Sequence, residues 1–220
     1  MLKLYGFDVS NYYNMLKLAM ASKGLEYEVE VIYPNQTPDY LKRSHMGKVP
    51  ALETEHGMLT ETNIIMEYLD AAYPDRPLYS GDAFQQAKIK ELVKLCELYL
   101  ELPARRCHPE VFFGGKVSDE IKKDVKRALF KGIEGLARLA KFSPYLAGDE
   151  FTAADIMFLY SADLAAGVAH KLFDVDLLAL APGAKELMLS LNEREDVKQI
   201  AADRKEANIA FKKYVASLQN

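Results

Sequence analysis

The chain has 220 residues, of which half are hydrophobic and 27% are charged, proportions that are typical of a folded soluble protein. Its formal net charge is −4, from 28 basic and 32 acidic residues, which excludes the strong basic excess of a nucleic-acid-binding domain. The sequence has no run of about 18 apolar residues, so no membrane span is predicted. The first residues lack the pattern of a secretory signal peptide. We therefore expect a cytoplasmic protein.

The first 31 residues predict a strand, a helix and a second strand. Residues 2–5 are apolar-rich and end at Gly6, as in a short strand. Apolar residues then recur at helical spacing from Ser10 to the pair Lys23-Gly24. Residues 27–31 alternate apolar and acidic side chains, which predicts a strand with one apolar and one solvent-exposed face. Such a unit normally forms a right-handed crossover between parallel strands.

The following stretch predicts a hairpin and a helix. The turn at His56-Gly57 is short, so the strands on its two sides are expected to pair antiparallel. The predicted elements are a short helix at 40–44, a third strand beginning within 47–52, a fourth strand at 58–60 and a helix from Thr62 to just before Pro74. This βαβ–ββα order is that of an α/β thioredoxin-like domain, with helices packed on a small sheet.

A proline-rich linker separates this domain from an all-α domain. Residues 73–77 contain two prolines, which resist both helix and central strand. We therefore predict domains at 1–76 and 83–220. The second is predicted to hold helices at 85–102 (closed by Pro103), 119–142, 152–171, 183–191 and 197–218.

The two cysteines, Cys96 and Cys107, form neither a Cys-x-x-Cys motif nor a zinc pattern. We expect both to be reduced thiols, as is usual in a reducing compartment.

Ser10 has two interpretations. Serine is a preferred N-cap, and capping is the more common role of a serine at a helix start. The same position lies in the positive field of a helix N-terminus, which favours a bound anion. A thiolate there would be stabilised, and the serine hydroxyl could donate a hydrogen bond to it.

Two further pairs of residues also have both a structural and a ligand-binding interpretation. Val49-Pro50 opens a strand, and a cis bond there could expose the backbone of Val49 to a peptide ligand. Thr62 suits the N-cap of the following helix, whose free amide groups also suit a carboxylate, while Glu61 suits an ammonium group. By contrast, Thr152 and Asp155 fit a capping box, which we interpret as structural.

Together these motifs resemble the glutathione S-transferase family over nearly the full length of the chain, with a bacterial, serine-type member as the best match. The resemblance rests on Leu4-Tyr5 followed by Ser10, on residues 47–52, on Glu61-Thr62 with Ile65, and on residues 148–156. Each motif is modest alone, but their order and spacing are specific.

The resemblance implies a glutathione site. Ser10 would be the catalytic residue that hydrogen-bonds the glutathione sulfur. Val49, ahead of a cis-Pro50, would pair with the cysteinyl backbone. The remaining implied contacts are Glu61 and Thr62 with the γ-glutamyl end, and Lys48, with help from His45, on the glycyl carboxylate.

The sequence departs from the serine-type pattern after Ser10, where residues 11–14 read Asn-Tyr-Tyr-Asn. Tyr5, Tyr12 and Tyr13 are therefore rival partners for the sulfur. No cysteine occupies the position found in beta-type members, so mixed-disulfide chemistry is not expected here.

The resemblance also implies a pocket for the second substrate. Its candidates are Tyr12, Tyr13, Tyr99, Arg105, Arg106, Phe112 and Phe113. The aromatic residues could equally be core. The two arginines could receive an anionic substrate or could simply be solvated.

The function implied is conjugation of glutathione to small electrophiles, with a role in detoxification. No metal or redox cofactor is expected, because glutathione is a co-substrate. The implied partners are glutathione, a small electrophile and a second copy in a homodimer, with neither nucleic acid nor membrane. The alternative is a non-catalytic glutathione-transferase-like module for protein contacts. A thiol-disulfide oxidoreductase is less suitable, because the required cysteine is missing.

Overall fold

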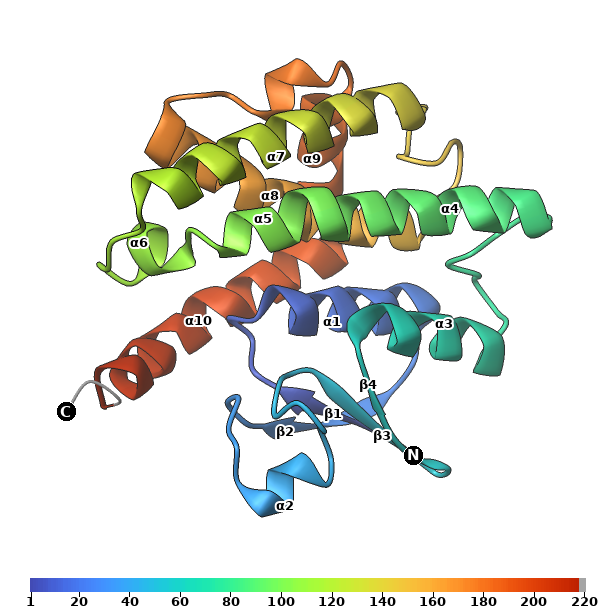
Figure 1. Ribbon diagram of the computed structural model, residues 1–220. Helices are drawn as coiled ribbons and strands as arrows, with labels where there is room; N and C mark the ends of the chain where they lie inside the picture. The colour runs from blue at the N-terminus through green and yellow to red at the C-terminus, as the bar shows by residue number, and fades with distance from the viewer. Residues whose placement is uncertain (218–220) are drawn as a thin grey trace. The chain divides into compact units, whose positions relative to one another are not determined.

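The computed structural model describes residues 1–217, and its contacts divide them into two compact units (Figure 1). The first unit combines Met1–Leu78 with the C-terminal segment from Glu193, and the second is Tyr79–Asn192. The C-terminal helix therefore groups with the N-terminal unit, whereas the sequence predicts it in the helical domain.

The first unit is built on a four-stranded sheet of order β2-β1-β3-β4. β1 (Leu2–Gly6) pairs parallel with β2 (Tyr27–Val31) and antiparallel with β3 (Ala51–Thr54). β4 (Gly57–Thr60) completes the predicted hairpin with β3. This confirms the thioredoxin-like topology, although β3 begins at Ala51 rather than earlier in 47–52.

Two helices cover one face of this sheet and a short one lies on the other (Figure 1). α1 (Asn11–Lys23) and α3 (Thr62–Ala72) share the first face, while α2 (Pro38–Leu41) lies on the second. The core between sheet and helices consists of fully buried apolar side chains, including Leu4, Leu18, Leu52, Ile65 and Leu69.

The prediction that one face of β2 is apolar and buried is wrong. Val29 and Val31, expected on an apolar face, are 49% and 66% exposed. β2 is an edge strand, so its apolar side chains have little covering them. Glu30 is instead half-buried, in ion pairs with Lys3 and Arg43.

A buried lysine ties the linker to the first unit. The side chain of Lys23 is fully buried and pairs with Asp70 at 2.9 Å. The Lys23 ammonium also donates to the carbonyls of Asp75 and Arg76, and Asp70 accepts from the amide of Leu78. These bonds fix the segment in which the first unit gives way to the second.

The last helix of the first unit, α10 (Glu195–Ser217), packs against α1. Its predicted last residue, Leu218, lies outside the described residues. Lys17 on α1 donates to Asp203 on α10 at 2.6 Å and to Asp8, before α1, at 2.5 Å. Burial alone would raise the pKa of Asp203, but hydrogen bonds from Lys17 and Gln199 lower it overall.

The second unit is helical. Its elements are α4 (Ala83–Cys96), the π-helical η1 (Glu97–Glu101), α5 (Leu102–Arg105), α6 (His108–Phe112), α7 (Asp119–Leu139), α8 (Ala153–Phe173), the 3₁₀ turn η2 (Leu178–Leu180) and α9 (Ala184–Asn192). α8 is the central helix and packs on α4, η1 and α7. By length and composition α8 could cross a membrane, but 61% of its most apolar window is buried inside the protein, as in a core helix. Cys96 and Cys107 are buried and free.

Pro103 does not close the helix that starts the second unit, contrary to the prediction. The chain widens into the π-turn η1 and continues helically as α5, with Pro103 in its first turn. Proline has no amide hydrogen to give to the carbonyl four residues earlier, which here belongs to Tyr99. The π-turn accommodates that loss without ending the helix.

Candidate functional site

Ser10 is the N-cap of α1, as the sequence predicts. Its hydroxyl oxygen accepts a hydrogen bond from the amide of Tyr13 at 3.4 Å, and its own amide donates to the carbonyl of Phe7 at 3.0 Å. The first turn of α1 contains no acidic residue. Because the cap uses a lone pair of the oxygen, the hydroxyl hydrogen stays available to a second partner.

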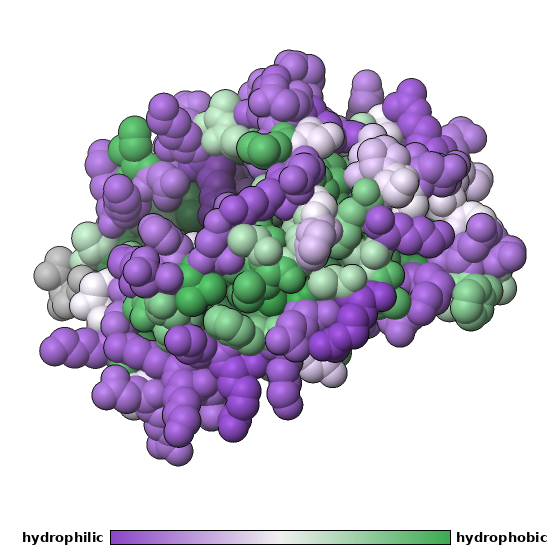
Figure 2. All heavy atoms as spheres, turned by 90° about the horizontal axis from the view of Figure 1, so that it is seen from above, coloured by the Kyte–Doolittle hydropathy of each residue, from purple (hydrophilic) through white to green (hydrophobic). Residues whose placement is uncertain are grey.

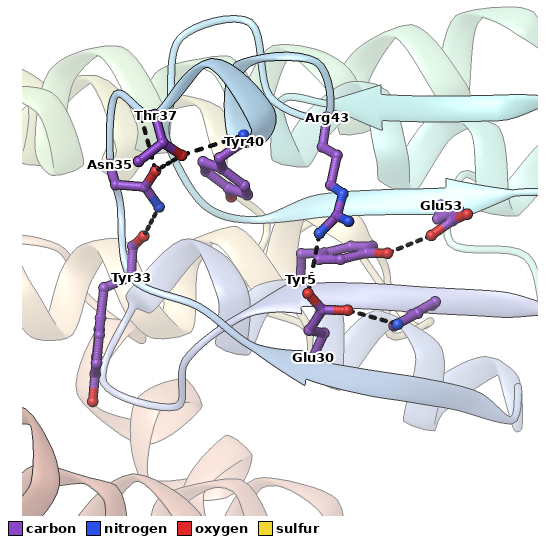
Figure 3. Close-up of polar contacts among 9 residues, drawn as sticks. Tyr5, Glu30, Tyr33, Asn35, Thr37, Tyr40, Arg43 and Glu53 are labelled. Atoms are coloured by element: carbon purple, nitrogen blue, oxygen red, sulfur yellow. Dashed lines mark hydrogen bonds and ion pairs between the residues drawn. The ribbon is translucent and has the colours of Figure 1, made fainter.

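Two of the three rival tyrosines, Tyr5 and Tyr13, have hydroxyl groups in environments that do not suit a bond to the glutathione sulfur. The hydroxyl of Tyr5 points along the sheet and donates to Glu53, while Arg43 lies over its ring (Figure 3). Tyr13 is 1% exposed, and burial together with the charges of Asp8 and Asp203 raises the pKa of its hydroxyl. A negatively charged sulfur would be unfavourable next to those carboxylates. Tyr12 is half-buried in the first turn of α1 and is therefore the rival to compare with Ser10.

The loop that carries Lys48 and Val49 is held by side-chain bonds to its backbone. The carbonyl of Lys48 accepts from Tyr40 and from Ser44, both at 2.8 Å, and the amide of Lys48 donates to Ser44 at 3.1 Å. The ammonium of Lys48 is exposed and makes no ion pair within residues 1–217. The bond Val49-Pro50 is cis, which confirms that prediction.

Gly47 is required by the geometry of this loop. Its φ is +63°, and a Cβ there would lie 2.2 Å from the carbonyl oxygen of Asn35. Asn35 itself belongs to a hydrogen-bonded turn with Tyr33 and Thr37, which leads into α2 (Figure 3). The β2–α2 loop and the Lys48 loop are thus packed backbone against backbone.

Glu61 and Thr62 lie at the start of α3, but their roles as caps differ from the prediction. Glu61, not Thr62, is the N-cap, and its side chain makes no capping hydrogen bond. Thr62 is the first helical residue, and its hydroxyl donates to the carbonyl of Tyr12 at 3.5 Å. Glu61 has a φ of 68°, a strained conformation for a residue with a side chain, of the kind that clusters at ligand sites.

The candidates for an electrophile pocket are divided between the two units. Tyr12 and Tyr13 belong to the first unit, and the others belong to the second. Arg105 is not free, because it pairs with the fully buried Glu101 at 2.7 Å. Phe112 packs edge-on against His108 and, like Phe113, is about half exposed. Tyr99 and Arg106 both line a groove against α7 within the second unit.

Sequence reasoning missed an aromatic cluster that links α10 to the loops around Ser10. Phe211 stacks on Phe7 at 5.1 Å, and Tyr214 stacks on Tyr33 at 4.0 Å between ring centroids. Phe7 and Tyr33 also meet edge-on at 4.9 Å. The spacing of Phe211 and Tyr214, three residues apart on one helix face, was the available signal.

Ser10 and the two other segments predicted to bind glutathione, the loop of Lys48 and Val49 and the start of α3 at Glu61, therefore all belong to the first unit. Two helix N-termini, a fixed loop with an exposed lysine and a strained acidic residue are features suited to an anionic, extended peptide. A thioredoxin-like sheet with this set, in one chain with a helical unit, defines the class of glutathione-transferase folds.

Comparisons with known proteins agree with that class. The family described as "Glutathione S-transferase, N-terminal domain" matches residues 4–77. A glutathione S-transferase of Pseudomonas putida is 46% identical over 217 residues, 99% of each chain. A zeta-class glutathione S-transferase of Euphorbia esula is 30% identical over 70% of this chain and 72% of its own. The structure of glutathione transferase F2 from Populus trichocarpa covers 94% of this chain and 100% of its own, with a TM-score of 0.77 at 23% identity, which shows the same fold.

The chain belongs to the glutathione S-transferase family.

Proposed function

We propose that this transferase binds glutathione in its first unit and activates it as a thiolate for attack on small electrophiles, with Ser10 as the catalytic residue. The observation that carries this proposal is the geometry of Ser10. Its oxygen caps α1 through a lone pair, so its hydrogen can be donated to a sulfur without loss of the cap. The absence of acidic residues from the first turn of α1 leaves the positive end of the helix dipole uncompensated there.

These interactions are large enough for the reaction. A free thiol with a pKa of about 8.5 is only about 3% ionised at pH 7. Lowering that pKa by about two units requires roughly 2.7 kcal/mol of preference for the thiolate. One charge-assisted hydrogen bond contributes about 1.5–3 kcal/mol and a helix N-terminus about 0.3–1 kcal/mol.

The rest of the tripeptide is proposed to bind along the same unit. The exposed ammonium of Lys48 suits the glycyl carboxylate, and the backbone of Val49 suits the cysteinyl residue as an added strand. At α3 the N-cap side chain leaves the first amides uncapped, which suits the γ-glutamyl carboxylate. The carboxylate of Glu61 would receive the γ-glutamyl ammonium.

Glutathione should stabilise the native protein if this proposal is correct. At a concentration 100 times its dissociation constant the gain in the free energy of unfolding is about 2.7 kcal/mol. Thermal unfolding with and without several millimolar glutathione measures this gain, and the same buffer without glutathione is the reference. A melting temperature that does not move would favour the non-catalytic module instead.

We also propose that the protein is a cytoplasmic homodimer with a role in detoxification. Its contact surfaces would be α3 and α4, where Ile64 and Phe84 are 53% and 73% exposed. Burial of such side chains is a usual driving force of association. Figure 2 shows hydrophobic residues exposed among hydrophilic ones at the surface.

The oligomeric state can be measured directly. One chain has a mass of 24.8 kDa, so light scattering at micromolar concentration should give roughly twice that value, about 50 kDa, for the C₂ dimer that is commonest among homo-oligomers. A particle of one chain's mass at that concentration contradicts the dimer.

A further inference from the structure

The aromatic side chains of α10 contact two loops of the proposed glutathione site. Phe211 and Tyr214 are three residues apart and therefore share one face of the helix. Phe211 stacks on Phe7 with ring centroids 5.1 Å apart, and Tyr214 stacks on Tyr33 at 4.0 Å. The two loop rings also meet each other edge-on, at 4.9 Å. These four rings form a single aromatic cluster within the first unit.

One side of the aromatic cluster fixes the loop that leads into Ser10. The carbonyl of Phe7 accepts a hydrogen bond from the amide of Ser10 at 3.0 Å. The next residue, Asp8, pairs with Lys17 of α1, and the same ammonium pairs with Asp203 of α10 at 2.6 Å. The side chain of Lys17 is only 12% exposed, so salt screens these ion pairs little. The helix therefore holds this loop by two contacts, a stacked ring and a shared cation.

The other side of the aromatic cluster fixes the turn behind the Lys48 loop. The carbonyl of Tyr33 accepts a hydrogen bond from the side-chain amide of Asn35 at 2.9 Å (Figure 3). The backbone amide of Asn35 donates to the carbonyl of Gly47 at 3.1 Å, directly before Lys48. A displacement of the Tyr33 ring would therefore reach the Lys48 loop through Asn35.

We propose that α10 positions both halves of the proposed glutathione site, with Phe211 acting on Ser10 and Tyr214 acting on Lys48. The inference rests on the proposed function, because it names the residues that orient the groups proposed to bind glutathione. Phe211 and Tyr214 are positioning residues, since each acts through the ring of a loop residue. Such contacts matter because a displacement of about 1 Å, caused far from the reacting atoms, can lower a rate by about 100-fold.

Hydrogen exchange in the free protein tests whether α10 holds the two loops. Phe211→Leu and Tyr214→Leu each remove one ring, and leucine is a good helix former. In Phe211→Leu the amide of Ser10 should exchange roughly 2–10-fold faster, the factor that corresponds to the loss of one aromatic pair. In Tyr214→Leu the same change is expected at the amide of Asn35. Because this measurement needs no ligand, its result does not depend on the proposed function.

Glutathione binding then separates the two positioning roles. Phe211→Leu should raise the pKa of the bound thiol by up to about one unit, a tenfold loss of thiolate, with a smaller change in Kd. Tyr214→Leu should raise Kd roughly 2–10-fold, with a thiol pKa close to that of the wild type. A general loss of stability would not produce these two opposite patterns in the folded molecules.

Three variants serve as controls. Phe211→Tyr and Tyr214→Phe keep the rings, so both should match the wild type in exchange and in binding. Ile209→Ala removes an apolar side chain from the same helix, but Ile209 is 65% exposed and lies outside the aromatic cluster. It should leave both loops unchanged.

Two results would overturn the inference alone. One is unchanged exchange at Ser10 and Asn35 in both leucine variants. The other is faster exchange with the wild-type Kd and thiol pKa, which would mean that α10 only stabilises the fold. Failure of the proposed function would instead appear in the wild type itself, which would not bind glutathione, and the inference would fall with it.

Discussion

Replacing Ser10 with alanine should lower turnover at pH 6.5 by roughly 10–150-fold. This range corresponds to the loss of about 1.5–3 kcal/mol from one charge-assisted hydrogen bond to the thiolate. The affinity for glutathione should change less, because the other proposed contacts hold the rest of the tripeptide. The expected signature is thus a loss in kcat at nearly constant Kd, which points to stabilisation of the anion and not of the bound ligand as a whole.

The effect of Ser10→Ala should depend on pH. Without the serine the pKa of bound glutathione should rise toward the value of the free thiol, about 8.5. Above that pH glutathione ionises unaided, so the difference between wild type and variant should shrink. A loss of the same size at pH 6.5 and pH 9.5 would mean that Ser10 does not act through the thiolate.

Tyr12→Phe is the decisive comparison, because Tyr12 is the half-buried rival in the first turn of α1, two residues after Ser10. The thiolate absorbance of bound glutathione, followed against pH, reports the sulfur directly. Tyr5→Phe and Tyr13→Phe serve as controls, since one hydroxyl donates to Glu53 and the other is buried. If Ser10→Ala titrates like the wild type while Tyr12→Phe shifts upward, Ser10 is only a helix cap.

Local patterns predicted most of the elements because their causes lie within a few residues. Ser10 caps α1 and Gly24, with a φ of 68°, ends it, both as expected from the propensities of serine and glycine. The hairpin at His56-Gly57 follows from loop length alone. The α8 capping box is likewise formed by two residues three positions apart.

The failures have tertiary causes. Val29 and Val31 have the pattern of a buried face, but strand order places them at the edge of the sheet. Pro103 has a strong tendency to end a helix, yet the chain continues helically past it because the π-helical turn η1 accommodates the missing hydrogen bond. In this turn the carbonyl of Tyr99 lies against Gly132 of α7. The pairing of Arg105 with Glu101 could have been suspected from its spacing of four residues.

The position of α10 was the hardest feature to foresee. Its sequence is mostly polar, and its partners, Lys17 and the rings of Phe7 and Tyr33, lie about 180 to 205 residues away along the chain. The composition of the helix does not indicate whether it packs beside α1 or within the helical unit. Its position is determined by contacts with residues near the start of the chain.

Asp155→Ala should be the most destabilising substitution considered, at about 3–5 kcal/mol of unfolding free energy at pH 7. The buried carboxylate accepts from the amide of Leu146 at 2.7 Å, and from the amide and hydroxyl of Thr152 at 2.8 and 3.1 Å. Removing it leaves buried donors without partners, each costing about 1–3 kcal/mol. Thr152→Ala is the matched smaller change and should cost about 1 kcal/mol, the usual loss of an N-cap. Urea unfolding measures both, and equal losses would contradict the central role of Asp155.

Turnover per folded molecule should stay nearly unchanged in Thr152→Ala and Asp155→Ala, since neither residue belongs to the first unit. A large loss of activity at unchanged stability would mean that the capping box has a catalytic role.

The pH dependence of stability offers an independent measure of the Asp155 site. Burial raises the pKa of its carboxyl to about 6, against the lowering effect of the bonds from Leu146 and Thr152. In the unfolded chain the pKa is about 3.9, so between these values the native state binds a proton that the unfolded state has lost. The stability contributed by this proton is fully present below about pH 4 and is lost as pH rises through 6, roughly 3 kcal/mol in all. Asp155→Asn cannot titrate, so its stability gap to the wild type should widen on acidification from pH 7 to pH 4. A gap that narrows instead would show that the three hydrogen bonds outweigh burial and hold the carboxyl ionised.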